Sequence, residues 1–585
     1  MQHGYIKIAA AVPQLHLADP AANAAEACVL IARAAESGVR VLVFPALSLT
    51  GVTCGDLSYH QPLLSAARQA LCTVAEATKD RELLCFVGLP LQEDGEVIPV
   101  TAAVYDGAVL GFVPKGEAPE TLLFEGKAIP CRRGLCFTHP DYPDLTVSAC
   151  RNTAAALQCL PGAAFEIAGG AAARRAKVQA ASRRNGCAVV CVNPGPGESS
   201  QDRVYAGHAV AAQSGEILAE MQWQHGLLVA EIALQAPISE CVARCEAAAE
   251  PNLSPAPFLP EEHADDFCRE ILRLQAEGLR RRMEHAFAKK LVIGVSGGLD
   301  STLALLVAAR ALDLSGRPRE DLLAVTMPCF GTTARTRSNA EILSERLGAD
   351  FMTVDIRAAV EQHFADIGHD SSVTDVTYEN SQARERTQVL MDLANRFGGM
   401  VVGTGDLSEL ALGWATYNGD HMSMYGVNAG LPKTLVRRVV EVFAADCADS
   451  ALRESLLDVV ATPVSPELLP PDAGNIAQKT EDLVGPYELH DFYLYYTLTY
   501  GFGPAKIFRL AQSAFAGIYE EPTILKWLET FFRRFFAQQF KRSCLPDGVA
   551  PLAVSLSPRG GFAMPSDASR GAWQAELDAL REVVG

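Results

Sequence analysis

The residues best suited to chemistry in this 585-residue chain form one short stretch, Leu291-Val-Ile-Gly-Val-Ser-Gly-Gly-Leu-Asp300-Ser301. The apolar run 291–295 predicts a buried strand, the next three residues a tight turn, and the chain from Ser301 a helix. Such a turn is an anion cradle, because free backbone N–H groups and the positive end of the helix dipole point at the same place. Asp300 adds a carboxylate oxygen, the kind of ligand that Mg²⁺ prefers. The stretch therefore predicts a site for a phosphate and a magnesium ion.

The turn lacks the lysine of an ordinary P-loop. As Ser-Gly-Gly-Leu-Asp-Ser it resembles the pyrophosphate loop of ATP pyrophosphatases, which adenylate a carboxylate or carbonyl group and release pyrophosphate. The alternative is a strand-to-helix turn without a ligand. The resemblance implies that ATP is bound by Gly294, Val295, Ser296, Gly297, Gly298, Leu299, Asp300, Ser301 and Thr404.

The elements around this stretch alternate between strands and helices. Strands are predicted at 291–295, 322–327, 351–356 and 400–403, and helices at 262–288, from 301 onward and at 336–347. This alternation is typical of an α/β, doubly wound parallel sheet, which binds ligands at the carboxyl ends of its strands.

Two runs rich in polar residues fall at that edge, 377–388 and 403–421, the second continuing to Pro432-Lys433-Thr434. They resemble NAD⁺ synthetase in its long form, which carries an N-terminal nitrilase-like glutaminase domain. The likeness continues through residues 478–482, 485–491, 539–542, 555–560 and 564–568. It departs at Val549-Ala550-Pro551 and at Gly561-Phe562-Ala563, where the family has other residues.

The resemblance also implies which side chains hold the substrates. Asp300 and Glu409 would share Mg²⁺, because a metal on ATP phosphates usually takes one or two protein carboxylates. Aromatic faces would stack on a pyridine or adenine ring, and cations, among them Lys479, would neutralise phosphates. The expected deamido-NAD⁺ site comprises Asn380, Arg384, Glu409, Trp414, Ala415, Thr416, Tyr417 and Lys433.

The first half of the chain opens with a strand at 6–12, a helix at 22–37 and a strand at 39–44, which predicts a layered α/β domain. Segments around Ala46, Lys115 and Cys150 resemble the three motifs of nitrilase-type amidases, and so imply a nitrilase-like α/β sandwich. That chemistry uses a Glu base, a Lys and a Cys nucleophile, but the Glu position here is Ala46. A cysteine without a base stays mostly a thiol at neutral pH. We therefore expect Lys115 and Cys150 to be remnants of a glutaminase site.

Length and composition set the remaining expectations. The chain is too long for one core, and five prolines mark a linker at 235–261. We therefore expect a nitrilase-like domain at 1–234 and a synthetase domain, similar to adenine nucleotide alpha hydrolases, at 262–585. A net charge of −19 argues against nucleic-acid binding. There is no signal-peptide pattern or membrane-length apolar run, so a cytoplasmic protein is expected. The pairs Cys187/Cys191 and Cys241/Cys245 lack a matching His and are interpreted as buried thiols rather than zinc ligands.

The resemblance to NAD⁺ synthetase implies a ligase that converts deamido-NAD⁺ to NAD⁺ with ATP and Mg²⁺, through an acyl-adenylate, and Ala46 at the base position favours ammonia as nitrogen donor. A fully glutamine-hydrolysing NAD⁺ synthase stays open, as does another ATP pyrophosphatase such as a GMP synthetase or tRNA thiolase. A non-catalytic scaffold is the alternative from another class, and the intact loop and Glu409 argue against it. Family resemblance also implies a homo-oligomer.

Overall fold

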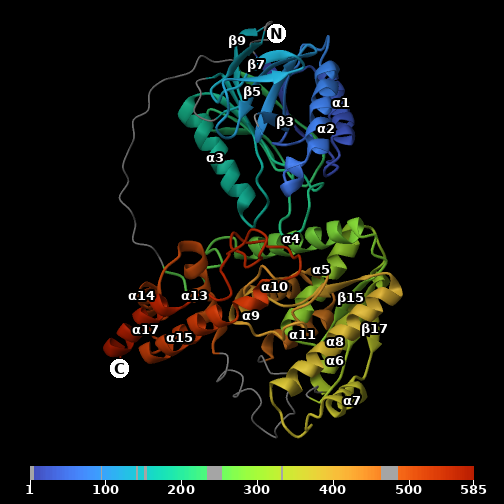
Figure 1. Cartoon of the computed structure of the whole chain (residues 1–585), viewed down its shortest axis with the longest axis vertical. Helices are drawn as coiled ribbons and strands as arrows, with labels where there is room; N and C mark the ends of the chain where they lie inside the picture. Colours follow the sequence, from blue (N-terminus) through green and yellow to red (C-terminus); the bar gives the residue numbers. More distant parts are fainter. Residues whose placement is uncertain are drawn as a thin grey trace. The chain divides into compact units, whose positions relative to one another are not determined.

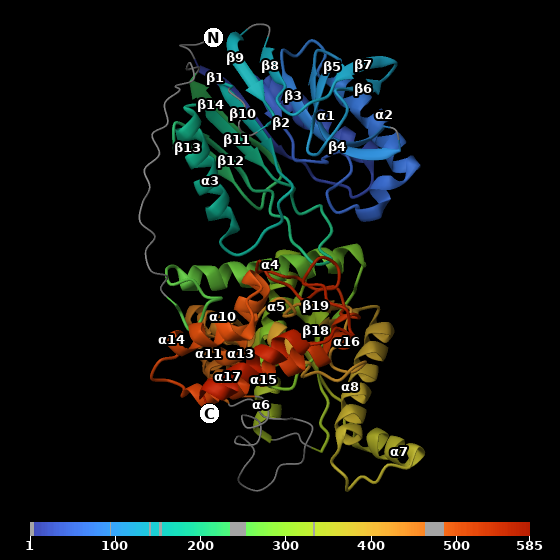
Figure 2. The same cartoon turned by 60° about the vertical axis from the view of Figure 1, so that its left-hand side comes forward.

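The computed structural model describes residues 5–93, 95–139, 142–150, 155–233, 253–330, 334–462 and 485–584 (Figures 1 and 2). The chain forms two compact units, one of residues 1–199 and 204–247, the other of residues 200–203 and 248–585. Four residues from the first half of the sequence thus belong to the second unit. Most of the expected linker at 235–261 lies outside the described residues, as do Lys479, Cys241 and Cys245.

The first unit contains two six-stranded sheets, ordered β14-β1-β2-β3-β4-β5 and β13-β12-β11-β10-β9-β8. The strands of the first sheet are β1 (Tyr5–Val12), β2 (Val39–Val43), β3 (Leu84–Glu93), β4 (Glu96–Tyr105), β5 (Ala108–Pro114) and β14 (Gly226–Ala233). Those of the second are β8 (Cys136–His139), β9 (Tyr142–Ser148), β10 (Leu157–Pro161), β11 (Ala188–Val192), β12 (Ala209–Gln213) and β13 (Glu216–Met221). The hairpin of β6 (Thr121–Phe124) and β7 (Lys127–Pro130) is a separate two-stranded sheet, and its Leu122, Phe124 and Ile129 pack in the core under the first sheet.

Apolar side chains at alternating positions hold the two sheets face to face. Ile8, Val41 and Phe86 from one sheet share a buried core with Val147 and Val190 from the other. Helices α1 (Pro20–Glu36) and α2 (Gln61–Ala77), preceded by η1 (Gly55–Tyr59), cover the outer face of the first sheet, and α3 (Gly170–Asn185) covers that of the second. This four-layer arrangement confirms the predicted nitrilase-like α/β sandwich.

The second unit is built on a five-stranded sheet of order β17-β16-β15-β18-β19, in which every neighbouring pair is parallel. Its strands are β15 (Leu291–Gly294), β16 (Leu322–Thr326), β17 (Asp350–Thr353), β18 (Met400–Gly403) and β19 (Tyr425–Gly426). The strand order reverses between β15 and β18, and ligands bind at such a switch point in open parallel sheets. The loop with Asp300 follows β15, and Thr404 follows β18.

Helices cover both faces of this sheet. Helices α5 (Leu299–Leu314) and α6 (Ala334–Leu347) pack on one face, and α8 (Val376–Phe397) packs along β15 and β18. This arrangement confirms the doubly wound class. Further helices complete the layers: α4 (Ala264–His285), η2 (Arg319–Asp321), α7 (Arg357–Ile367), α9 (Leu407–Leu412), α10 (Lys433–Asp446) and α11 (Ser450–Ala461).

The last hundred residues form a separate helical layer of the second unit, at the red end of the chain in Figure 1. It comprises α13 (Tyr487–Tyr500), α14 (Pro504–Ala514), α15 (Glu521–Ala537), α16 (Gln539–Arg542) and α17 (Gly571–Val584). Its core is aromatic, with Phe492, Phe531, Phe532 and Phe535 almost fully buried together with α9. This core fixes α9, which carries Glu409, against the helices.

The strand expected at 351–356 is shorter than predicted, and β17 ends at Thr353. Ile356 instead caps α7 and is 1% exposed, so its apolar side chain marks the start of a helix. A short apolar run does not distinguish these two states. Among the described residues, no helix combines the length and apolar character needed to cross a membrane.

We expect Phe531→Ala to destabilise the second unit by about 3–5 kcal/mol, because a buried ring is replaced by a cavity. Phe531 is fully buried and packs on the rings of Tyr493 and Phe535. Urea unfolding followed by tryptophan fluorescence measures the change. Leu457→Ala is the control, since Leu457 on α11 is 47% exposed; equal effects of both substitutions would contradict the assigned core.

Candidate active site

The turn between β15 and α5 has the backbone of an anion cradle. Gly297 has φ +83°, a left-handed conformation that favours glycine, and Gly298 is the N-cap of α5. Because Gly298 has no side chain, it leaves the first N–H groups of α5 without a side-chain cap. The hydroxyl of Ser301 donates to the carbonyl of Gly298 at 3.0 Å, and the N–H of Gly298 donates to Ser296 Oγ at 3.2 Å. The loop is thus preformed to receive an anion.

Three carboxylates surround one ammonium group beside this loop. Lys433 Nζ lies 2.5 Å from Asp300 Oδ2, 2.6 Å from Asp406 Oδ2 and 2.9 Å from Glu409 Oε1. The side chain of Lys433 is 6% exposed and that of Asp406 is fully buried. The ring of Tyr487 lies 5.3 Å from the same ammonium group. The cluster joins α5, α9, α10 and α13, and carries a formal excess of negative charge.

Burial and mutual repulsion control the protonation of this cluster. Burial raises the pKa of Glu409 to about 7, against the attraction of Lys433. Burial likewise raises the pKa of Asp406. Burial alone would lower the pKa of Lys433, but the three carboxylates raise it well above its usual value. The lysine therefore stays charged, and the surplus of carboxylates favours a further cation.

The donor set fits a divalent metal. Ligand oxygens of Asp300, Asp406 and Glu409 all lie within 4.8 Å of one another. Asp300 Oδ1 is buried and, within the part of the chain that the structure describes, has no hydrogen-bond partner. Carboxylate oxygens without competing nitrogen or sulfur ligands are typical of Mg²⁺.

A buried amide connects the phosphate loop to the neighbouring strand. Asn428 Nδ2 donates to the carbonyls of Asp300 at 2.9 Å and Thr404 at 3.0 Å. Its Oδ1 accepts from Gln275 Nε2 on α4 at 3.0 Å. Asn428 is completely buried, so it fixes the spacing between the ends of β15 and β18.

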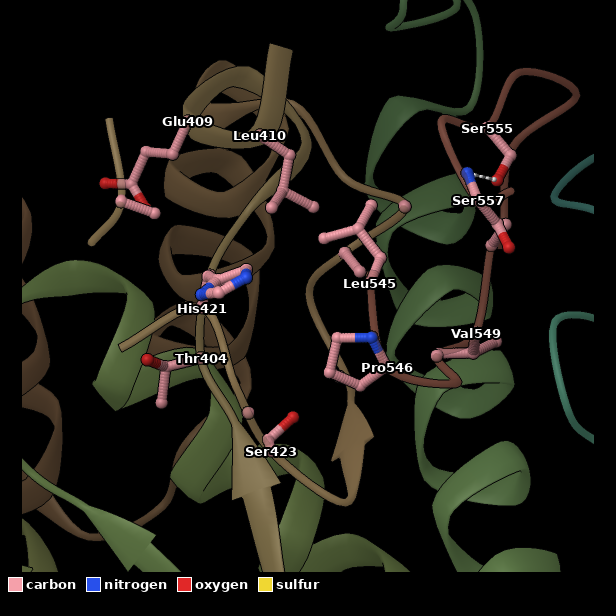
Figure 3. Close-up of a pocket in the computed structure, with 18 of the residues that line it drawn as sticks. Thr404, Glu409, Leu410, His421, Ser423, Leu545, Pro546, Val549, Ser555 and Ser557 are labelled. Carbon is pink, nitrogen blue, oxygen red and sulfur yellow. Dashed lines mark hydrogen bonds between the residues drawn. The ribbon is translucent and has the colours of Figure 1, made fainter. Parts of the chain in front are cut away.

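A pocket opens next to the acidic cluster, and Figure 3 shows the side chains that face it. One wall comes from Thr404, Glu409 and Leu410, with His421 and Ser423 beside them, and the facing wall comes from the C-terminal segment between Leu545 and Ser557. The remaining lining residues are Asp202, Asp300, Gly403, Gly405, Ala415, Asp420, Gly426, Ala429 and Gly430. The empty space between these walls is about 760 Å³, open mouth included.

The expected deamido-NAD⁺ residues divide into exposed and structurally engaged groups. Tyr417 is 43% exposed and lies beside the rings of His421 and Phe540. Arg384 is exposed and donates to the carbonyl of Tyr417 at 3.3 Å. Both side chains can therefore reach a ligand.

The other members of this group already have partners in the fold. Trp414 is covered on one face by the Arg534 guanidinium, 3.5 Å from its ring centre. Asn380 Oδ1 accepts the Thr416 hydroxyl at 2.8 Å, and the Ala415 carbonyl accepts from Lys541 Nζ at 2.6 Å. These contacts fix the conformation of the segment 414–417, which ends at Tyr417.

In the first unit, Ala46 follows β2 and is 2% exposed, with its N–H donating to the carbonyl of Gly162 at 2.9 Å. Lys115 follows β5 and is exposed. Cys150 follows β9, is half-buried against the inter-sheet core, and its N–H donates to Ser148 Oγ at 3.3 Å. Residues 151–153, which replace a family motif, lie outside the described residues. Cys187 and Cys191 are buried thiols in the core under α3.

Sequence reasoning did not select Asp406, Asn428 or Asp202. Asp406 was recognisable as the N-cap of α9 in Asp406-Leu-Ser-Glu409, a capping pattern. Its contact with Lys433, and those of Asn428, depend on segments far apart in the sequence.

A phosphate loop and buried carboxylates at the switch point of a doubly wound sheet make the second unit a nucleotide-binding α/β enzyme. A family model described as NAD synthase matches residues 271–496. The glutamine-dependent NAD(+) synthetase of Mycobacterium tuberculosis is 34% identical, covering 100% of this chain and 98% of the relative. That of Mycobacterium leprae is 35% identical, with 99% and 98% covered. The chain belongs to the glutamine-dependent NAD⁺ synthetase family and is a ligase, which confirms the resemblance inferred from its motifs.

Solved structures share the fold over nearly the whole chain. A glutamine-dependent NAD(+) synthetase from Cytophaga hutchinsonii has a TM-score of 0.80 at 18% identity, with 98% of this chain and 100% of that chain covered. One from Acinetobacter baumannii, solved in complex with ADP, has a TM-score of 0.64 at 21% identity, with 96% and 97% covered.

We expect Asp300→Asn to slow pyrophosphate release at least ~100-fold, because the amide removes one negative charge from the metal-binding set. Melting temperature should stay near the parent value, since the amide keeps the shape of the side chain. Asp313→Asn is the matched control, because Asp313 lies on the same helix and pairs with the surface residue Arg319. Near-parent pyrophosphate release by the Asp300 variant would show that this loop does not serve adenylation.

Proposed function

We propose that this NAD⁺ synthetase amidates deamido-NAD⁺ with MgATP and takes its nitrogen from free ammonia, using glutamine poorly or not at all. The nicotinate carboxylate attacks the α-phosphorus of ATP, giving an acyl-adenylate and pyrophosphate. Ammonia then attacks the acyl carbon and releases AMP and NAD⁺. The observation that carries the choice of donor is the buried methyl group of Ala46, at the position of a required base.

The proposed work of the second unit is positioning and neutralisation of charge. Ser296 to Ser301 would hold the pyrophosphate portion of ATP through backbone N–H groups, and Thr404 would contact the nucleotide. Asp300 and Glu409, joined by Asp406, would hold Mg²⁺, which when bound stabilises negative charge on the phosphate oxygens. Lys433, which now compensates these three carboxylates, would turn one or more of its donors to the phosphates.

Glutamine hydrolysis requires a group that removes the thiol proton and later activates water. The Ala46 methyl group can accept no proton. Two buried carboxylates of the first unit are committed to other partners. Glu198 accepts from the N–H groups of Val52 and Thr53, and Glu166 pairs with Arg174.

Glu117 and Glu125 are close to Lys115 in sequence and are the remaining candidates for a base. Both are exposed, and Glu125 occupies the turn between β6 and β7 with φ +48°. A general base must be held within hydrogen-bond reach of the thiol, and a side chain exposed in a surface segment is not fixed there by its surroundings. Because general base catalysis contributes about 10²–10⁴-fold, loss of the base at position 46 should lower glutamine use by at least that factor.

The donor prediction is tested at saturating deamido-NAD⁺ and MgATP, with ammonium and glutamine compared side by side. We expect NAD⁺ formation with ammonium, and a rate at least ~100-fold lower with glutamine, because no base activates Cys150. Glutamate release is measured in parallel, and Cys150→Ala should leave the ammonium-driven rate unchanged. Comparable rates with both donors, with the glutamine rate lost in Cys150→Ala, would establish the fully glutamine-hydrolysing alternative.

A second prediction concerns the exposed aromatic side chain of the proposed deamido-NAD⁺ site. Tyr417→Ala should raise the KM for deamido-NAD⁺ several-fold more than that for ATP, because a stacked ring contributes about 0.5–1.5 kcal/mol beyond its buried area. Tyr500→Ala is the control, since Tyr500 is also exposed, at 55%, but lies on α13 rather than in the segment 414–417. A proportional rise in both KM values would assign Tyr417 to shaping the segment rather than to binding.

The remaining assignments belong to the same proposal. Residues 1–234 would form a nitrilase-like domain without efficient catalysis, 235–261 a linker and 262–585 the synthetase domain. We also propose a cytoplasmic homo-oligomer, on the strength of family membership.

A further inference from the structure

One wall of the pocket is an extended segment from the C-terminal part of the chain, residues 545–557, which we call the C-terminal strap. Leu545, Pro546, Val549, Ser555 and Ser557 from this strap face the pocket in Figure 3. Gly548 and Ala550 also line it. No helix runs through the strap, so its position depends on contacts with neighbouring segments.

Glycine residues on both sides allow the strap to lie directly against the edge of the sheet. Gly548 and Gly426 form a parallel bridge, and a Cβ atom on Gly548 would lie 2.4 Å from the Gly426 carbonyl oxygen. The N–H of Gly426 donates to the carbonyl of Asp547 at 2.7 Å. A Cβ atom on Gly430 would lie 2.5 Å from the Cα of Ala550. The strap therefore has little freedom to move toward the sheet.

The opposite side of the strap is held by residues 200–203, the four residues that join the second unit from the first half of the sequence. The N–H of Gly548 donates to the carbonyl of Gln201 at 2.9 Å, and that of Ala550 to the carbonyl of Asp202 at 3.2 Å. Arg203 Nη1 donates to the carbonyls of Ala550 at 3.2 Å and Leu552 at 3.3 Å. Tyr425, fully buried, donates its hydroxyl to the carbonyl of Ser200 at 2.8 Å, which fixes the other end of this short segment.

The carboxylate of Asp202 adds charged contacts to these backbone bonds. Its Oδ1 accepts the Ser557 hydroxyl at 2.8 Å and Arg559 Nη2 at 3.1 Å, and its Oδ2 accepts Arg559 Nε at 3.2 Å. The same guanidinium donates to the carbonyls of Leu545 and Pro546, at 2.9 and 2.8 Å. It also pairs with Asp547, which in turn pairs with Arg282 of α4. Asp202 is 12% exposed, so these bonds form largely out of water.

We infer that Asp202, acting through Arg559 and Ser557, is a positioning residue that sets the C-terminal strap as the wall of the deamido-NAD⁺ side of the pocket. The inference rests on the proposed function for the identity of the ligand. Arg559 binds the first two strap residues and Asp202 the last, so one ion pair closes both ends of the segment. Ala415 of the proposed deamido-NAD⁺ site, with Asp420 and His421 after it, lines the same pocket as the strap, whereas Asp300 is the one residue of the proposed ATP loop at 294–301 that lines it.

This arrangement gives the first half of the chain a role that glutamine hydrolysis does not require. Residues 200–203 are encoded there, between β11 and β12 of the nitrilase-like sandwich, yet they complete the pocket wall of the second unit. A synthetase unit without them would lose the carbonyl acceptors for Gly548 and Ala550 and one of the two carboxylates that pair with Arg559. The proposed absence of a catalytic base at position 46 does not affect this role.

The test uses the full chain with Asp202→Asn, which keeps the size of the side chain but removes its charge. We expect the KM for deamido-NAD⁺ with ammonium as donor to rise about tenfold, the factor that corresponds to about 1.4 kcal/mol. The KM for ATP should change less than about twofold and kcat less than about threefold, because uniform binding is lost rather than a contact to the reacting atoms. Asp202→Glu should recover part of the affinity. Arg559→Lys, which keeps a charge but loses the planar fork, should repeat the loss.

The matched control is Asp446→Asn, which removes an equally well-formed pair with Arg269 on the surface of the same unit. Hydrogen exchange measures the protection of the strap amides directly. Asp202→Asn should speed exchange of the Gly548 and Ala550 amides, while the amides of the central sheet strands should keep their protection. Titration calorimetry with deamido-NAD⁺ gives the affinity without turnover. If the parent enzyme forms no NAD⁺ from ammonium, the proposed function fails, and exchange and calorimetry still decide the role of Asp202. Unchanged exchange and affinity in Asp202→Asn would overturn the inference, as would equal rises in both KM values or a general loss of stability.

Discussion

The ammonium group of Lys433, held between Asp300, Asp406 and Glu409, is the interaction on which the second unit depends. Three carboxylates removed from water repel one another and would be costly to bury without a counter-charge. Each of the four side chains comes from a helix start or a strand-to-helix turn, so the cluster exists only when α5, α9 and α10 are packed at their observed positions. Neighbouring elements hold these helices in place. Asn428 joins the ends of β15 and β18, and the aromatic core of the C-terminal helices holds α9.

The cluster is also unbalanced, since one lysine does not neutralise three carboxylates. The raised pKa of Glu409, about 7, and of Asp406 is the direct result of burial with too little positive charge. A protein rarely keeps such an arrangement for stability alone, and perturbed carboxylates in a pocket are typical of functional sites. A divalent cation held by Asp300, Asp406 and Glu409 would offset this surplus of negative charge.

The two halves of the chain differ in how closely their candidate sites are connected to their cores. The first unit is stabilised by alternating apolar residues between its sheets and under its helices, and Ala46 is compatible with that packing because a methyl group needs no partner. The packing of the sandwich therefore does not require a glutamate at position 46. In the second unit the site and the core are interlocked. Residues 200–203, which come from the first half of the sequence, also belong to the second unit and accept hydrogen bonds from the C-terminal strap.

The sequence by itself determined the class of each half, the glycine-rich turn before α5 and the presence at position 46 of alanine, which can accept no proton. These features depend on local periodicity and short motifs: a strand followed by Ser296 to Ser301, parallel strands separated by helices, and Ala46 within a recognisable segment. Only the tertiary structure decided that Lys433 neutralises Asp300, Asp406 and Glu409, that Arg534 covers Trp414, and that Asp202 meets Arg559. Asp202 and Arg559 are 357 residues apart, and no local pattern encodes a pair at that separation. Contacts of this kind arise from the packing of whole elements, and with them the shape and charge of the site.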